Sequence, residues 1–137
     1  MESKWRVRAL RGATTVPENT REAIVAGARE LTEAMIAAND LALDDIASVI
    51  LTATPDLDAE FPAVGAREAG LVDVALLCAQ ELAVPGGPER CIRMLMHINT
   101  QKAAAELVHV YLHGAQRLRP DWARPLVSSD GKRQRDG

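Results

Sequence analysis

Residues 76–96, LLCAQELAVPGGPERCIRMLM, decide how the rest of this chain is organised. An apolar run ends close to Cys78 and Glu81. The segment Pro85–Pro88 then reverses the chain, and the second apolar run that follows contains Arg93. If both runs are strands, this turn brings Glu81 and Arg93 to the same region of one sheet. A carboxylate and a guanidinium placed there form either a structural ion pair or a polar ligand site.

Composition and charge narrow the class of protein. The 137 residues are expected to form a single domain over residues 1–122, followed by a flexible tail over residues 123–137. A net charge of -3 and an aromatic content of 3% argue against nucleic-acid binding. No apolar run approaches the roughly 18 residues of a membrane span, and the charged N-terminus lacks a signal-peptide pattern, so we expect a cytoplasmic protein without membrane contact. The two cysteines are expected to be free thiols.

The remaining segments predict an α+β fold with a mixed sheet of about five strands, one long helix and short helices. The long helix is expected to begin at Asn19, with Glu22 as its reciprocal capping acid, and to end near Asn39. Its apolar stripe consists of Ile24, Ala28, Leu31, Met35 and Ala38. Strands are expected at residues 5–12, 46–54, 73–78, 91–99 and 108–118, and short helices at residues 58–70 and 101–107. One long helix covers only part of such a sheet, so other copies of the chain are expected to bury the rest.

Alternation places two arginines within strands. From residue 91 to residue 99 the even positions are all apolar, so Arg93 lies in the middle of a strand on the opposite face. Arg11 shares its face with Trp5 and Val7. Either it belongs to a site, or the strand ends there and the guanidinium reaches water.

Several familiar motifs are excluded by geometry. His109 and His113 would lie about 13 Å apart in a strand, too far to share one metal ion, so no metal site is expected. Gly86–Gly87 has no phosphate-loop pattern around it and is expected to be a turn. Cys78 has no general base nearby in the sequence, so we expect it to be a small buried thiol, as most free cysteines are. A nucleophilic role stays open.

Six segments occur in an order and spacing that resemble a known family. They are RGATTV at 11–16, TATPDLDAEFPA at 52–63, CAQE at 78–81, the GG and CIRMLM segments within 86–96, HVYL at 109–112 and LRPD at 118–121. Together they resemble the monofunctional chorismate mutases of the trimeric α+β class, which differ from the all-helical class with the same activity. The resemblance extends from about Arg6 to Asp121. It implies a homotrimer with a barrel-like core of sheets, active sites between neighbouring subunits, and conversion of chorismate to prephenate without a cofactor.

The resemblance also assigns roles to individual residues. Arg93 would face the ether oxygen and the side-chain carboxylate of chorismate. Arg11 would bind a carboxylate, with Tyr111 hydrogen-bonded to it. Glu81 and Cys78 would bind the ring hydroxyl. Because the rearrangement is pericyclic, neither a nucleophile nor a proton shuttle is needed.

The resemblance implies three roles for the other residues. Phe61 and Ala63 would pack on the ring, and Leu76, Leu77 and Leu118 would form the pocket walls. Arg67 and Arg119 would guide the dianion at the pocket mouth. Two departures from the family concern the ring carboxylate, since Val64 stands where a lysine is common and Leu77 where a polar residue is common. Two other functions stay open at this point. One is a non-catalytic trimeric module that binds a small dicarboxylate, and the other is an imine or enamine deaminase on a similar sheet.

Overall fold

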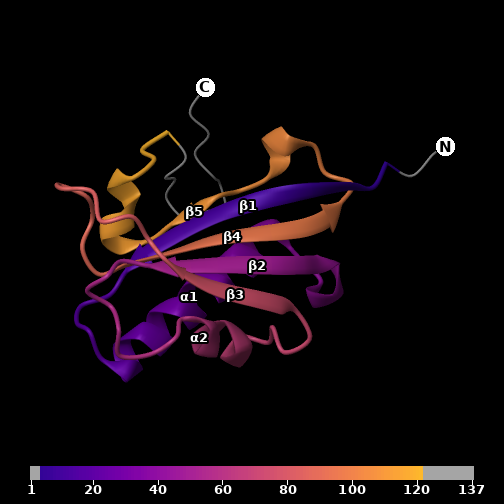
Figure 1. Ribbon diagram of the computed structural model, residues 1–137. Coiled ribbons are helices and arrows are strands. Elements are labelled where there is room, and N and C mark those ends of the chain that lie inside the picture. The colour runs from indigo at the N-terminus through magenta and orange to yellow at the C-terminus, as the bar shows by residue number, and fades with distance from the viewer. Residues whose placement is uncertain (1–3, 122–137) are drawn as a thin grey trace, which may run out of the picture.

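Five strands form one mixed sheet in the computed structural model, which describes residues 4–121. The strands are β1 (Arg6–Thr15), β2 (Ile46–Ala53), β3 (Ala75–Gln80), β4 (Cys91–Thr100) and β5 (Val110–Tyr111), and their order across the sheet is β3-β2-β4-β1-β5 (Figure 1). Strand β4 runs antiparallel to both β1 and β2, while β3 and β5 pair in parallel with β2 and β1. The α+β fold with a mixed sheet of about five strands is therefore confirmed.

Two helices cover one face of this sheet (Figure 1). Helix α1 (Arg21–Asn39) begins after Thr20, whose hydroxyl accepts a hydrogen bond of 3.1 Å from the backbone N–H of Ala23. The prediction of Asn19 as the cap is thus wrong by one residue, because the Asn19 side chain instead binds residues 58 and 59. Helix α2 (Ala63–Glu68) packs against α1, and its Gly65 allows the two backbones to approach closely.

The two hydrophobic patterns of the sequence meet between the sheet and α1. Four of the five residues of the helix stripe are fully buried, and Ala38 is partly buried. The even positions of β4 are at most 2% exposed and face the same core: Ile92, Met94, Met96 and Ile98. A sheet face covered by helices excludes water from one side only, so the side chains of the odd β4 positions lie on the open face.

Strand β1 differs from its prediction. It continues through Gly12 to Thr15, because all ten of its residues pair with β4. Its buried side carries Leu10, whereas Trp5 and Val7 are 56% and 65% exposed. Arg11 therefore lies within the strand, on the open face of the sheet.

The C-terminal part of the described chain is less regular than predicted. The predicted strand over residues 108–118 is wrong beyond Tyr111, since the chain turns at His113 (φ 53°) into the short 3-10 helix η3 (His113–Arg117). The N–H of Gly114 donates to the hydroxyl of Thr15 at 3.0 Å, which fixes this turn against β1. Two further 3-10 helices are η1 (Leu43–Asp45) and η2 (Ala104–Glu106), the latter within the predicted helical segment 101–107.

Among residues 4–121, no helix has both the length and the apolar character needed to cross a membrane. The expected flexible tail, residues 123–137, lies outside the described residues.

Candidate active site

A guanidinium and a carboxylate meet on the open face of the sheet. Arg93 lies near the start of β4, and Glu81 directly follows β3. The backbone N–H of Glu81 donates to the carbonyl of Ala53 at 2.9 Å, which anchors the chain beside β2. The Nε of Arg93 lies 3.4 Å from Oε2 of Glu81, and both side chains are about three-quarters buried, at 27% and 25% exposed. The turn at residues 85–88 therefore brings the two groups together, as the sequence predicted.

This ion pair leaves one donor of Arg93 without a hydrogen bond in the described part of the chain. The carboxylate oxygen Oε2 of Glu81 accepts a short hydrogen bond of 2.7 Å from the hydroxyl of Thr52. The Nε of Arg93 is buried and has no hydrogen-bond partner within residues 4–121. A buried donor without a partner is costly, and this arrangement therefore favours a ligand site over a closed structural ion pair.

Arg11 and Tyr111 extend the site across β1 and β5. Ala13 pairs with both Arg93 and Tyr111 in the sheet, and Arg11 lies two residues before Ala13 on the same face. Diagonal neighbours of this kind lie roughly 7–8 Å apart, within reach of arginine side chains. The sheet therefore gathers side chains from three adjacent strands and the end of β3 on one face.

The phenol of Tyr111 is a neutral donor in this setting. Its side chain is 3% exposed, and its hydroxyl has no hydrogen-bond partner within the described chain. Burial raises the pKa of Tyr111, while the positive charges of Arg11, Arg119 and Arg93 act in the opposite direction. Three guanidinium groups thus bear on one buried hydroxyl.

Leu118 and Arg119 complete the group at its edge. Leu118 packs against the small apolar cluster around Tyr111. Arg119 donates two hydrogen bonds to the carboxylate of Asp121, at 3.0 and 2.8 Å, which raise the pKa of Arg119. We call this set the arginine cluster: Arg11, Glu81, Arg93, Tyr111, Leu118 and Arg119.

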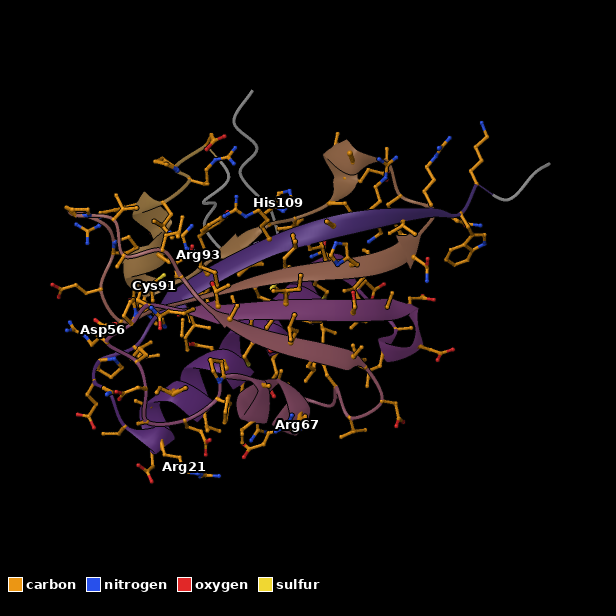
Figure 2. The ribbon with its side chains drawn as sticks, viewed as in Figure 1. Arg21, Asp56, Arg67, Cys91, Arg93 and His109 are labelled. Carbon is orange, nitrogen blue, oxygen red and sulfur yellow. The ribbon has the colours of Figure 1, made fainter. Side chains whose placement is uncertain are left out.

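The thiol of Cys91 lies beside Arg93 of the arginine cluster. It is fully buried, and Figure 2 shows it close to Arg93 and Asp56 at one end of the sheet. Burial raises the pKa of Cys91 despite the opposing charge of Arg93. The thiol is therefore protonated at neutral pH.

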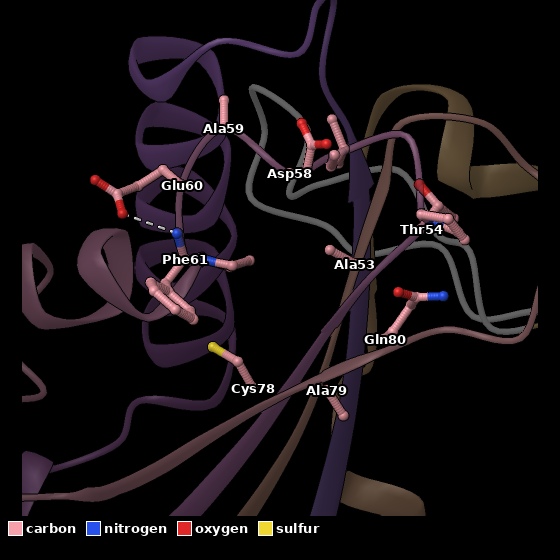
Figure 3. A pocket seen from close by; sticks show the side chains of 12 residues that line it. Ala53, Thr54, Asp58, Ala59, Glu60, Phe61, Cys78, Ala79 and Gln80 are labelled. Atoms are coloured by element: carbon pink, nitrogen blue, oxygen red, sulfur yellow. Dashed lines mark hydrogen bonds between the residues drawn. The ribbon is translucent and has the colours of Figure 1, made fainter.

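The other predicted residues form a second group, apart from the arginine cluster in a single chain. Phe61 and Cys78 line a hollow of about 400 Å³ beside the turn at Thr54–Pro55 (Figure 3). Cys78 pairs with the buried Leu51 and so lies on the helix side of β3, whereas Glu81 lines a neighbouring hollow with Arg93. The side chains of Cys78 and Glu81 therefore do not share one hollow.

Four more predicted residues belong to this second group by position. Leu76 lies on the helix side of β3, and Leu77 is 63% exposed on the open face. Ala63 is buried at the start of α2. Arg67 is exposed on α2, away from Arg93 (Figure 2). A single chain therefore does not bring these four residues to the arginine cluster.

The structure adds Thr52, a residue that sequence reasoning missed. It lies within the β-branched run of β2, where the pattern indicated only a buried strand. In the register of the sheet it pairs with Arg93, and its hydroxyl binds Glu81. No signal within the strand itself separates this threonine from ordinary strand packing.

His109 and His113 make local contacts. The Nδ1 of His109 accepts a hydrogen bond of 3.0 Å from the backbone N–H of Arg11, and Nε2 of His113 lies 3.0 Å from Glu30. In the part of the chain that the structure describes, no three His, Cys, Asp or Glu side chains group as metal ligands.

A mixed sheet with guanidinium groups, a carboxylate and a neutral phenol on its open face has the donors and the acceptor suited to a small anionic molecule. The family model for chorismate mutase type I matches residues 7–122. The chain is 47% identical over 116 residues to "Chorismate mutase AroH" of Thermus thermophilus, covering 84% of this chain and 95% of that protein. It is 41% identical over 116 residues to "Chorismate mutase AroH" of Bacillus subtilis, covering 84% and 91%.

A solved structure agrees with these sequence matches. The chorismate mutase from Clostridium thermocellum superimposes with a TM-score of 0.79 at 50% identity, over 80% of this chain and 98% of that one. The chain belongs to the chorismate mutase type I family.

Proposed function

We propose that this protein is an isomerase that converts chorismate to prephenate, a step in phenylalanine and tyrosine biosynthesis. The observation that carries the proposal is the buried Nε of Arg93, which has no hydrogen-bond partner within residues 4–121 although it lies beside a carboxylate. A donor that has no partner in a largely buried site can stabilise a charge that develops only during a reaction. The choice of chorismate as the substrate comes from the named relatives, which are all chorismate mutases.

The chemistry explains why the site consists of donors rather than of an acid, a base or a nucleophile. The carbon–oxygen ether bond of chorismate breaks as a carbon–carbon bond forms, so no proton is transferred. Negative charge builds on the ether oxygen, and the forked guanidinium of Arg93 is suited to stabilise it. The substrate must also be held in a compact conformer that is unfavourable in water.

The rest of the arginine cluster serves that second task. The carboxylate of Glu81 accepts a hydrogen bond from the ring hydroxyl. Arg11 and the neutral phenol of Tyr111 donate to a substrate carboxylate, because burial keeps the phenol protonated. Arg119, at the edge of the cluster, guides the dianion toward it.

The second group of residues completes the site from a neighbouring subunit. Phe61 is 67% exposed and contacts no residue of the arginine cluster through the hollow it lines. Val7 and Leu77 on the open face of the sheet are both more than half exposed, as is Trp5 just before β1, and apolar surface of this kind favours burial against other copies. In a homotrimer, the exposed Phe61 packs on the ring of a substrate held by the next subunit. The protein acts in the cytoplasm.

Two measurements test this proposal. Purified protein incubated with chorismate is expected to consume it, as followed by its ultraviolet absorbance, with prephenate as the product. Sedimentation is expected to give three times the mass of one chain. A rate of chorismate loss equal to that of the buffer control would leave only a dicarboxylate-binding module. Ammonia release from an imino acid would instead indicate a deaminase, and the comparisons favour neither alternative.

A further inference from the structure

The hydroxyl of Thr52 lies beside the arginine cluster and donates a hydrogen bond to its Glu81. Thr52 pairs with Arg93 across the β2–β4 ladder, so both side chains lie on the open face of the sheet. Glu81 reaches the same place from the end of β3, where its backbone is bonded to Ala53 on β2. Three elements thus direct a hydroxyl, a carboxylate and a guanidinium toward one point.

Thr52 and Arg93 both approach the same oxygen of Glu81, but of the two only Thr52 forms a hydrogen bond with it. The hydroxyl donates to Oε2 at 2.7 Å, whereas Nε of Arg93 lies 3.4 Å from the same atom and makes no hydrogen bond to it. Hydrogen bonds between guanidinium and carboxylate are normally about 2.7–2.9 Å long and often bidentate. The carboxylate therefore stops short of the arrangement that this pair would ordinarily adopt.

We propose that Thr52 is a positioning residue that holds Glu81 back from Arg93. The hydroxyl fixes Oε2, which leaves the other oxygen of Glu81 for a substrate hydroxyl and the donors of Arg93 for the ether oxygen. This inference rests on the proposed function for its kinetic consequences. Without the hydroxyl, Glu81 is free to close onto Arg93, and a closed ion pair satisfies both groups before the substrate arrives.

Two substitutions at this position separate the hydroxyl from the shape of the side chain. Thr52→Val keeps the β-branched shape suited to a strand but removes the donor. Thr52→Ser keeps the donor and removes a methyl group. Thr52→Val is expected to lower kcat/KM about 10-fold, the scale of losing a hydrogen bond to a charged group, and Thr52→Ser is expected to stay within about 2-fold of wild type. Equal losses for the two variants would overturn the proposal.

A double-mutant cycle with Glu81→Ala tests whether Thr52 acts through Glu81. In that background the carboxylate is absent, so adding Thr52→Val is expected to change kcat/KM by less than about 2-fold. A loss of the same size in both backgrounds would mean that Thr52 contacts the substrate itself or supports the fold, and the inference would fail.

A crystal structure of each unliganded variant gives a readout that does not depend on turnover. In Thr52→Val the distance between Nε of Arg93 and the nearer Glu81 oxygen is expected to fall to hydrogen-bond length, while in Thr52→Ser it stays near the 3.4 Å of the wild type. An unchanged distance in Thr52→Val would refute the positioning role even if the wild type converts chorismate. Conversely, a wild type inactive on chorismate would refute the proposed function, and the two structures would still decide the role of Thr52.

Discussion

Replacing Arg93 by alanine should lower the catalytic rate strongly while changing the stability of the fold little. The Nε of Arg93 is buried without a hydrogen-bond partner in the described chain, so this donor is not committed to the fold. Removing one preorganised donor to developing charge lowers kcat by about 10² to 10³-fold, or about 2.7–4 kcal/mol. We expect Arg93→Ala to lose at least about 10²-fold in kcat.

The stability cost of the same change should be small. The Arg93–Glu81 contact is long, at 3.4 Å, and Nε of Arg93 makes no hydrogen bond within residues 4–121, so removing the guanidinium costs the fold no hydrogen bond from this atom. The partner carboxylate also keeps its hydrogen bond from Thr52. We therefore expect a loss of about 1 kcal/mol or less, and a melting temperature within about 5 °C of wild type.

The assay is steady-state turnover of chorismate, with thermal unfolding and sedimentation of the same samples. Arg29→Ala is a matched control, because it removes an equal charge from α1, where Arg29 is 51% exposed and pairs with Glu33. This control should keep full turnover. Arg93→Lys, which keeps the charge but not the fork, should stay well below wild type. Unchanged turnover in a folded Arg93→Ala protein would refute the role assigned to this guanidinium.

Three further changes test the site and the fold. Glu81→Ala should lower kcat/KM with little change in melting temperature, and a large loss of melting temperature would instead favour a structural ion pair. Desolvation tends to raise the pKa of Asp56, but hydrogen bonds from the hydroxyl of Thr54 and from a backbone N–H in the loop before β4 lower it overall. Asp56 therefore adds stability above its unfolded pKa of about 3.9 and loses it as pH falls through the lower folded value, so the melting-temperature gap between wild type and Asp56→Ala should shrink below about pH 4. Gly65→Ala should destabilise the protein by about 1–3 kcal/mol in denaturant titration, because the new Cβ would overlap the carbonyl oxygen of Val25, and an unchanged midpoint would contradict this close helix contact.

Local patterns predicted the elements in which one continuous side is buried and the other is not. The alternation in β4 identified the buried positions from Ile92 to Ile98 and placed Arg93 on the other face. The 3.6-residue stripe of α1 was equally reliable, since a helix against a sheet buries one continuous side. Boundaries were less reliable, because Thr20 and Asn19 are both good caps and only the contact of Asn19 with residues 58 and 59 decides between them.

The last predicted strand failed for a different reason. Residues 108–118 read as a strand, but only Val110 and Tyr111 find a partner, on the edge of β1. Beyond them the hydroxyl of Thr15 holds the turn into η3, about one hundred residues away in sequence. A contact of that separation leaves no trace in a local window.

The sequence by itself predicted which chemical groups the candidate site contains, since Arg11, Glu81, Arg93 and Tyr111 stand in segments that resemble one family, and it predicted that Arg93 lies within a strand, opposite the buried face. Only the tertiary structure decided how these groups meet. The pairing of β2 with both β3 and β4 sets Thr52 beside Arg93 and returns Glu81 to the same point, with an unequal division of one carboxylate oxygen. Strand register is a long-range property, fixed by burial of the whole helix-covered face, and so no single segment could reveal that arrangement.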